Sequence, residues 1–166
     1  MKKVTMHGNP VTLIGRLPDI GHKAPDFTVV DNSMAPKTLK DYRGKTLIIS
    51  AVPSLDTPVC DMETRKFNEL AAGLSDDVQI LTISMDLPFA QARWCGNAGI
   101  DRVITLSDHV SASFGEAYGV LIEGLRLLSR AVFIVDNKGM LRYVQVVPEI
   151  TQEPNYDDVL ESVKKL

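Results

Sequence analysis

The sequence contains few of the residues that mark several large classes of protein. Only two of its 166 residues are cysteines, Cys60 and Cys95, and they do not form a C-x-x-C pair. Two cysteines are too few for the disulfide framework of a secreted domain, and their spacing argues against an enzyme that exchanges disulfides within one helical turn. The three histidines are scattered along the chain. We therefore expect neither a metal site nor any other cofactor.

Long apolar runs and an excess of positive charge are also missing. No apolar run approaches the roughly 20 residues that a membrane-spanning helix needs. The opening "MKKVTMHGNP" has two lysines, but His7, Gly8 and Pro10 interrupt the apolar core that a signal peptide requires. The formal net charge of −3 offers no basic field for nucleic acid. These absences predict a cytoplasmic protein that binds neither membranes nor nucleic acids.

The overall composition is that of an ordinary globular domain. Hydrophobic residues make up 45% of the chain and charged residues 23%, and 166 residues can bury a sizeable core. We found no internal repeat or low-complexity segment. The sequence therefore predicts a single domain over residues 1–166.

Alternation of strand and helix patterns predicts an α/β architecture. Continuous apolar runs are typical of strands that are buried on both faces of a sheet, whereas period-3.6 patterns are typical of helices. The last two strands are expected to form a hairpin before a C-terminal helix, around a mixed central sheet. The expected elements are a hairpin over 4–15 around "GNP", a strand within 21–32, strands over 45–52, 78–84 and 102–107, helices over 58–74 and 86–99 (capped by Asp86), a hairpin over 130–147 and a helix over 153–166.

The segment "PSLDTPVC", residues 53–60, gives one cysteine a distinctive setting. Thr57 is a suitable N-cap and Pro58 suits the first helical position, so Cys60 falls in the first helical turn. Backbone N–H groups of that turn lack intrahelical partners and favour an anion, which favours thiolate over thiol. Free cysteines are also common as small buried hydrophobic residues. Helix position alone leaves both alternatives open.

At this point the sequence resembles a known family. "PSLDTPVC" matches P-x-x-x-T-x-x-C, the motif around the reactive cysteine of peroxiredoxins. Other segments are similar, in matching order along the chain, to the bacterial thiol peroxidase branch, which consists of atypical 2-Cys peroxiredoxins. These segments are "GNPVTL", "TRKFNEL", "DLPFAQARWCG", "VITLS", "AYGV" and "RAVFIVD". The resemblance implies a thioredoxin-like fold with an N-terminal β-hairpin.

The resemblance also implies a role for five residues. Cys60 corresponds to the peroxidatic cysteine and Cys95 to the resolving cysteine of the same subunit. Thr57 would hydrogen-bond the thiolate and the bound peroxide, and Pro53 would shield the pocket. Arg130 corresponds to the arginine beside the thiolate. An intramolecular Cys60–Cys95 disulfide would require local unwinding, which we expect within 57–66 and 89–99.

Each of these residues also has a simpler interpretation from the sequence alone. Thr57 could act only as a helix cap, and Pro53 could only end a strand. Arg130 could be a surface charge at the start of a strand. Cys95 could be a buried thiol, because sequence does not show whether its Cα lies within the ~7 Å of Cys60 that a disulfide needs.

The implied function is reduction of hydrogen peroxide and organic hydroperoxides through a sulfenic acid on Cys60. Thioredoxin is the implied reductant, and a homodimer is the implied assembly. A general disulfide oxidoreductase is disfavoured by the missing C-x-x-C pair. The remaining alternative is a redox sensor or partner-binding domain in which oxidation of Cys60 switches a surface.

Overall fold

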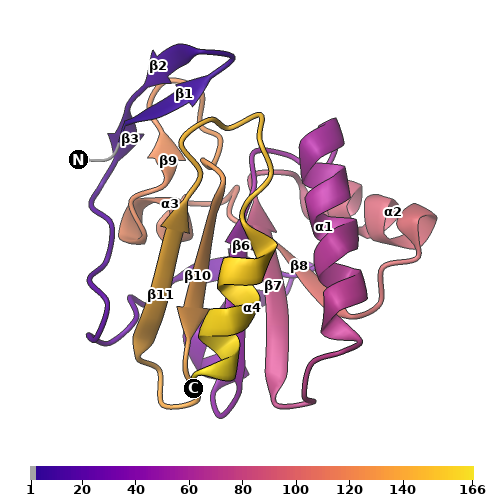
Figure 1. Cartoon of the computed structure of the whole chain (residues 1–166). Helices are drawn as coiled ribbons and strands as arrows, with labels where there is room; N and C mark the ends of the chain where they lie inside the picture. Colours follow the sequence, from indigo (N-terminus) through magenta and orange to yellow (C-terminus); the bar gives the residue numbers. More distant parts are fainter. Residues whose placement is uncertain (1–2) are drawn as a thin grey trace.

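A seven-stranded mixed sheet forms the centre of the molecule (Figure 1). The computed structural model describes residues 3–166, so Met1 and Lys2 of the expected domain lie outside the described residues. The strands are β1 (Val4–Met6), β2 (Asn9–Val11), β3 (Leu13–Ile14), β4 (Thr28–Val30), β5 (Pro36–Thr38), β6 (Thr46–Ala51), β7 (Val78–Ser84), β8 (Val103–Ser107), β9 (Leu121–Ile122), β10 (Ala131–Val135) and β11 (Leu141–Val146). The helices are η1 (Leu39–Tyr42, 3-10), α1 (Pro58–Ala71), α2 (Pro88–Ala98), α3 (Ser113–Ala117) and α4 (Tyr156–Lys164).

The order of strands in the central sheet is β11-β10-β6-β7-β8-β4-β5. Strands β6, β7 and β8 are parallel, whereas β10 and β11 on one side and β4 and β5 on the other pair antiparallel with their neighbours. The sequence prediction of an α/β, thioredoxin-like fold with a mixed sheet, flanking helices and an N-terminal hairpin is confirmed.

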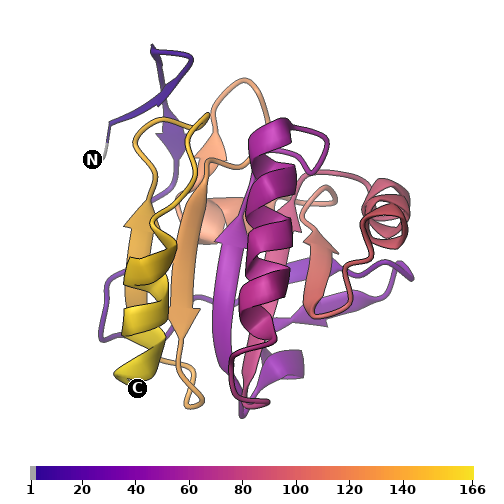
Figure 2. The same cartoon turned by 45° about the vertical axis from the view of Figure 1, so that its right-hand side comes forward.

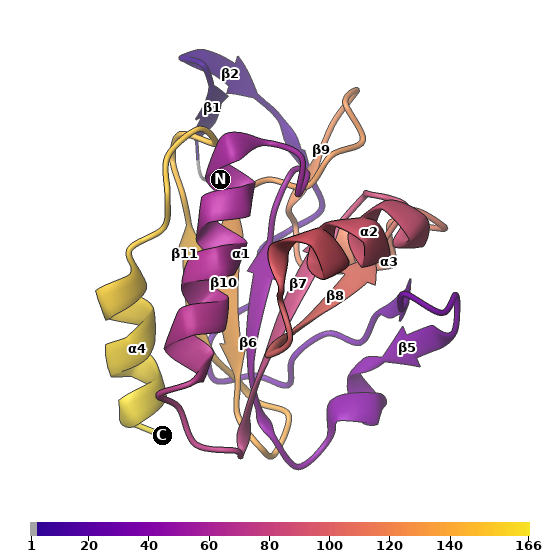
Figure 3. The ribbon, with the colours of Figure 1, turned by 90° about the vertical axis from the view of Figure 1, so that its right-hand side faces the viewer.

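The two faces of the sheet bury separate apolar clusters. Helices α1 and α4 lie side by side over one face (Figure 2), where Phe67 and Val159 pack with Ile48 and Val132 of the sheet. On the other face, the aromatic ring of Phe133 packs edge-on against the ring of Phe114 in α3. Helix α2 lies beside α1 and over β8 (Figure 3). Alternate residues of each strand therefore contribute to opposite layers, as the two-residue period of a strand requires.

The N-terminal hairpin turns earlier than the sequence predicted. Strands β1 and β2 pair from Val4 with Val11 to Met6 with Asn9, so the turn consists of His7 and Gly8 rather than "GNP". Both turn residues have positive φ, 51° and 80°, which matches the twist of a two-residue hairpin. The prediction gave too much weight to proline as a turn residue.

Candidate active site

Cys60 lies in the first turn of α1, directly after the loop that follows β6. Thr57 is the N-cap of this helix, and Pro58 occupies its first position, as the sequence predicted. The Cys60 backbone N–H donates to Thr57 Oγ1 at 3.3 Å. Cys60 is buried, with 0% of its surface exposed. The thiol is thus held inside the protein by the start of the helix.

The hydroxyl group of Thr57 is committed to its own turn in this structure. It donates to the Ser54 carbonyl oxygen at 3.0 Å while accepting from the N–H of Cys60. Pro53 is buried in the bend between β6 and this turn. The structure therefore shows Thr57 as a helix cap that shapes the loop around the thiol.

Arg130 brings a positive charge directly to the thiol. Its Nη2 lies 3.2 Å from Cys60 Sγ, and its Nε donates to the Ile150 carbonyl oxygen at 2.9 Å. Arg130 precedes β10 and is only 1% exposed. The interpretation of Arg130 as a surface charge is therefore wrong, because β10 is an interior strand of the sheet and the guanidinium contacts Cys60 and Glu63 of α1.

Glu63 is the third member of this buried cluster, and the sequence analysis missed it. Its Oε1 lies 3.4 Å from Arg130 Nη1, and its Oε2 accepts from Ser50 Oγ at 2.7 Å. Burial raises the pKa of Glu63 to about 7, even though Arg130 and Ser50 both act to lower that pKa. Glu63 and Phe67 follow Cys60 at spacings of three and seven, so extending the buried face of the helix back to the cysteine would have found it.

Asp86 supports the Cys60 loop instead of capping α2. The N-cap of α2 is Leu87, and it has no side-chain capping bond. The Asp86 carboxylate accepts from Ser54 Oγ at 2.7 Å, from the Leu55 N–H at 2.8 Å and from Ser84 Oγ at 2.8 Å. The sequence prediction of an Asp86 cap is wrong because the carboxylate accepts from three donors on the preceding loop and strand.

Cys95 lies on α2, apart from the cluster of Cys60, Arg130 and Glu63. Its Sγ is 3.5 Å from Thr105 Oγ1 on β8, and both cysteines are free thiols. Burial raises the pKa of the Cys95 thiol, although the hydrogen bond with Thr105 acts to lower it. The structure therefore contrasts one thiol beside a guanidinium with a second thiol that desolvation keeps protonated.

Trp94 and Arg65 connect the two cysteine-bearing helices. Trp94, the neighbour of Cys95, packs against the small apolar cluster that contains Cys60. The Arg65 guanidinium of α1 lies 5.7 Å from the centre of the Trp94 ring, within cation–π range. Arg65 also reaches the Ala98 carbonyl oxygen at 3.5 Å. Movement of either helix would change the surroundings of both cysteines.

Within residues 3–166, no group of three or more metal-ligating side chains is close enough to hold a metal ion. Over the same residues, no helix is both long enough and apolar enough to cross a membrane. At Cys60, Arg130 provides the thiol with a fixed cationic hydrogen-bond donor. Such a site can favour a sulfur nucleophile and stabilise a developing negative charge.

A family model and several relatives agree with this fold and site. The chain belongs to the Redoxin family, whose model matches residues 19–160. A thiol peroxidase of Bacillus subtilis (strain 168) is 55% identical over 166 residues, which cover 100% of this chain and 99% of the relative. A thiol peroxidase of Staphylococcus aureus (strain MRSA252) is 51% identical over 166 residues, covering 100% of both chains. These relatives confirm the sequence-based assignment to the thiol peroxidase branch of the peroxiredoxins.

Solved structures show the same similarity. A peroxiredoxin-like protein from Aquifex aeolicus superposes with a TM-score of 0.92 at 46% identity, covering 99% of this chain and 97% of that chain. A thiol peroxidase from Chromobacterium violaceum has a TM-score of 0.90 at 20% identity, covering 99% of this chain and 96% of that chain. At that identity the second similarity supports the fold alone.

Proposed function

We propose that this protein is a peroxidase of one domain over 1–166, in which Cys60 reduces hydrogen peroxide and organic hydroperoxides. The observation that carries the proposal is the contact between Arg130 Nη2 and Cys60 Sγ at 3.2 Å inside the protein. A guanidinium stays cationic and presents several donors in a fixed geometry, so it favours the thiolate and can bind a peroxide oxygen. Curated thiol peroxidases that match the full chain support the same reaction.

In the first step, the Cys60 thiolate attacks one oxygen of the peroxide. An S–O bond forms as the O–O bond breaks, and the leaving oxygen takes a proton to become water or an alcohol. Arg130 and the first turn of α1 stabilise the negative charge on that oxygen. Thr57 and Pro53 shape the loop that holds the peroxide against the sulfur. Cys60 becomes a sulfenic acid.

In the second step, the Cys95 thiol attacks the sulfenic acid of Cys60. A disulfide forms and water leaves. Because Cys60 is buried in the first turn of α1 and the Cys95 thiol on α2 contacts Thr105 on β8, we infer that the first turn of α1 and the end of α2 move before the sulfurs meet. Gly99, which ends α2 in a left-handed conformation, gives that segment a natural boundary.

In the third step, an external dithiol returns two electrons and two protons to the disulfide. We infer that thioredoxin is this reductant, that the protein acts as a homodimer, and that it works in the cytoplasm, as the family resemblance implies. An external dithiol is needed because the chain contains only these two thiols, both of which are consumed in the disulfide.

Thioredoxin-coupled NADPH consumption tests this function with hydrogen peroxide and cumene hydroperoxide as substrates. We expect many turnovers for the wild type, none for Cys60→Ser, and about one peroxide equivalent for Cys95→Ser before it stalls. A wild type that also stops near one equivalent with reductant present would instead indicate a redox sensor. Full activity in Cys60→Ser would refute the proposed role of Cys60.

A further inference from the structure

A second concave site lies at the opposite end of the sheet from Cys60. Strands β6 and β10 pair antiparallel, with Ala51 opposite Ala131 at the Cys60 end and Leu47 opposite Val135 at the other end. A pocket of about 550 Å³ opens over Leu47 and Val135. This volume falls within the range of about 300–1,000 Å³ that is typical of small-molecule sites. Neither Cys60 nor Cys95 lines the pocket.

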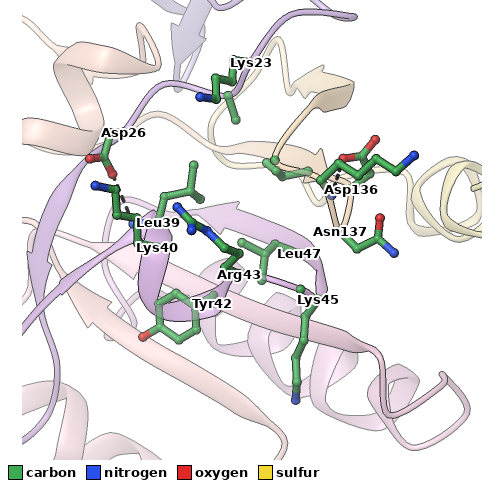
Figure 4. Close-up of a pocket in the computed structure, with 15 residues that line it drawn as sticks. Lys23, Asp26, Leu39, Lys40, Tyr42, Arg43, Lys45, Leu47, Asp136 and Asn137 are labelled. Carbon is green, nitrogen blue, oxygen red and sulfur yellow. Dashed lines mark hydrogen bonds between the residues drawn. The ribbon is translucent and has the colours of Figure 1, made fainter.

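The floor of this pocket is apolar. Ala24, Leu47 and Val135 are buried side chains that line it, and the half-buried Leu39 and Tyr42 form one side. In Figure 4, Leu39 and Leu47 lie near the centre of the view, and the Tyr42 ring lies below them with its hydroxyl directed away. Such a floor can hold a flat apolar group out of water.

The rim of the pocket is positively charged in a chain whose formal net charge is −3. Among residues 3–166, none of the five cations on the rim has an ion-pair partner: Lys23, Lys40, Arg43, Lys45 and Lys138. In Figure 4, Arg43 projects into the centre of the view and Lys23 lies across the cavity, whereas Lys45 extends away. The rim therefore carries an excess of positive charge at one opening.

The two acidic residues of the pocket, Asp26 and Asp136, offset only part of the charge of its five cations. Asp26 Oδ1 accepts from the backbone N–H groups of Phe27 at 2.9 Å and Leu39 at 3.3 Å. Asp136 accepts from Arg142 Nε at 2.8 Å, outside the pocket, and from two backbone N–H groups of its own turn. The hydrogen bonds that both carboxylates accept therefore stabilise the walls of the pocket.

Those walls are fixed by backbone hydrogen bonds. The segment that carries Lys23 and Ala24 pairs with the turn after β10, since the Ala24 N–H donates to the Gly139 carbonyl oxygen at 2.9 Å. A capping box between Thr38 and Asp41 holds the start of η1. The pocket is thus preformed, which lowers the entropic cost of binding.

We propose that this pocket binds a small organic anion in which phosphate groups are attached to a planar ring. Several separated cations favour a ligand with more than one negative charge, and arginine pairs well with phosphate. The apolar floor beside Tyr42 accommodates the ring. This proposal does not rest on the peroxidase function, because the site shares no residue with it.

Isothermal titration calorimetry tests the proposal with magnesium-free ATP, tripolyphosphate and adenosine as separate probes. We expect ATP to bind with a Kd below about 1 mM, and each of the other two probes to bind at least about tenfold more weakly. Lys40→Glu/Arg43→Glu should weaken ATP binding by at least about tenfold. The control Lys66→Glu/Arg126→Glu, which reverses the same charges at exposed positions outside the pocket, should change it less than about twofold.

Circular dichroism and thermal unfolding of both double variants establish that each variant is folded before titration. No binding of ATP at about 1 mM, or equal weakening in the pocket and control variants, would overturn the site. Tripolyphosphate binding as tightly as ATP would overturn the proposed ring.

Discussion

Substitutions in the buried pair of Arg130 and Glu63 should change folding stability and peroxidase activity independently. The two side chains are 2% and 0% exposed, and their charged atoms lie 3.4 Å apart. Replacing Arg130 with methionine leaves Glu63 buried with Ser50 as its remaining partner. Removing one member of a buried pair costs about 3–5 kcal/mol of folding free energy.

This cost should depend on pH because Glu63 titrates near neutrality. The pKa of Glu63 is already raised to about 7, and loss of Arg130 removes an interaction that lowers it. At pH 8 we expect Arg130→Met to cost about 3 kcal/mol, since the carboxylate must either stay charged without a partner or take up a proton. At pH 6 the carboxyl group is largely neutral in both proteins, so the cost should be smaller.

Urea unfolding followed by circular dichroism measures these costs at both pH values. Adding Glu63→Gln to Arg130→Met should recover stability at pH 8, because it removes the unpaired carboxylate. Peroxidase activity should be about 10²–10³-fold lower than that of the wild type in both variants, since the donor beside Cys60 is gone. Arg142→Met is a matched control: Arg142 is 48% exposed in its pair with Asp136, and its loss should cost less than about 1 kcal/mol. An Arg130→Met cost that is equal at pH 6 and pH 8, or a double variant no more stable than Arg130→Met at pH 8, would refute this reasoning.

Three further predictions test other parts of the structure. Burial raises the pKa of Glu63 from 4.5 to about 7, so the folded state binds the Glu63 proton more tightly than the unfolded state does. The free energy of unfolding should therefore fall as pH rises from about 4.5 to 7. In urea titrations, Glu63→Gln should flatten this pH dependence, and an unchanged pH dependence would contradict the raised pKa. Gly119→Ala should lower thermal stability more than Gly124→Ala, because both glycines have positive φ but only a Cβ at position 119 would meet the backbone of Arg16 and Leu17. Equal losses would argue against that close approach. Thr105→Val should speed disulfide formation a few-fold, because Cys95 loses a weak hydrogen bond worth up to about 1 kcal/mol. Stopped-flow tryptophan fluorescence measures this rate, and a slower or unchanged rate would count against movement of α2 as part of the reaction.

The parts of the fold that the sequence predicted have strong local signals. The strand before Cys60 is a continuous apolar run, and Thr57 and Pro58 both mark a helix start, so this loop and helix matched the structure. The N-terminal hairpin was expected, but its turn was placed around "GNP", whereas His7 and Gly8, both with positive φ, form it. Short elements such as β9, which pairs with the distant β3, have no local sequence pattern that predicts them.

The candidate site was predictable only where a residue type has one usual role at its position. Glu63 lies in the second turn of α1, where a charged residue more often faces solvent, and only the helical spacing from Cys60 to Glu63 and Phe67 indicates its burial. Its buried partners are Ser50 on β6 and Arg130 just before β10, both distant from Glu63 in the sequence. Asp86 was expected to cap α2 for the same local reason, whereas tertiary donors on Ser54 and Ser84 attract its carboxylate. Long-range polar pairing is what single-sequence patterns do not encode.

The most direct test of the account is peptide mapping of the wild type after one equivalent of hydrogen peroxide, without reduction. We expect intact mass spectrometry to show the loss of two hydrogens, and the digest to contain one peptide pair joined through Cys60 and Cys95. In Cys95→Ser, dimedone should label Cys60. A disulfide between two chains, or dimedone labelling of Cys95 while Cys60 stays reduced, would contradict the assignment of Cys60 as the attacking sulfur and Cys95 as its partner.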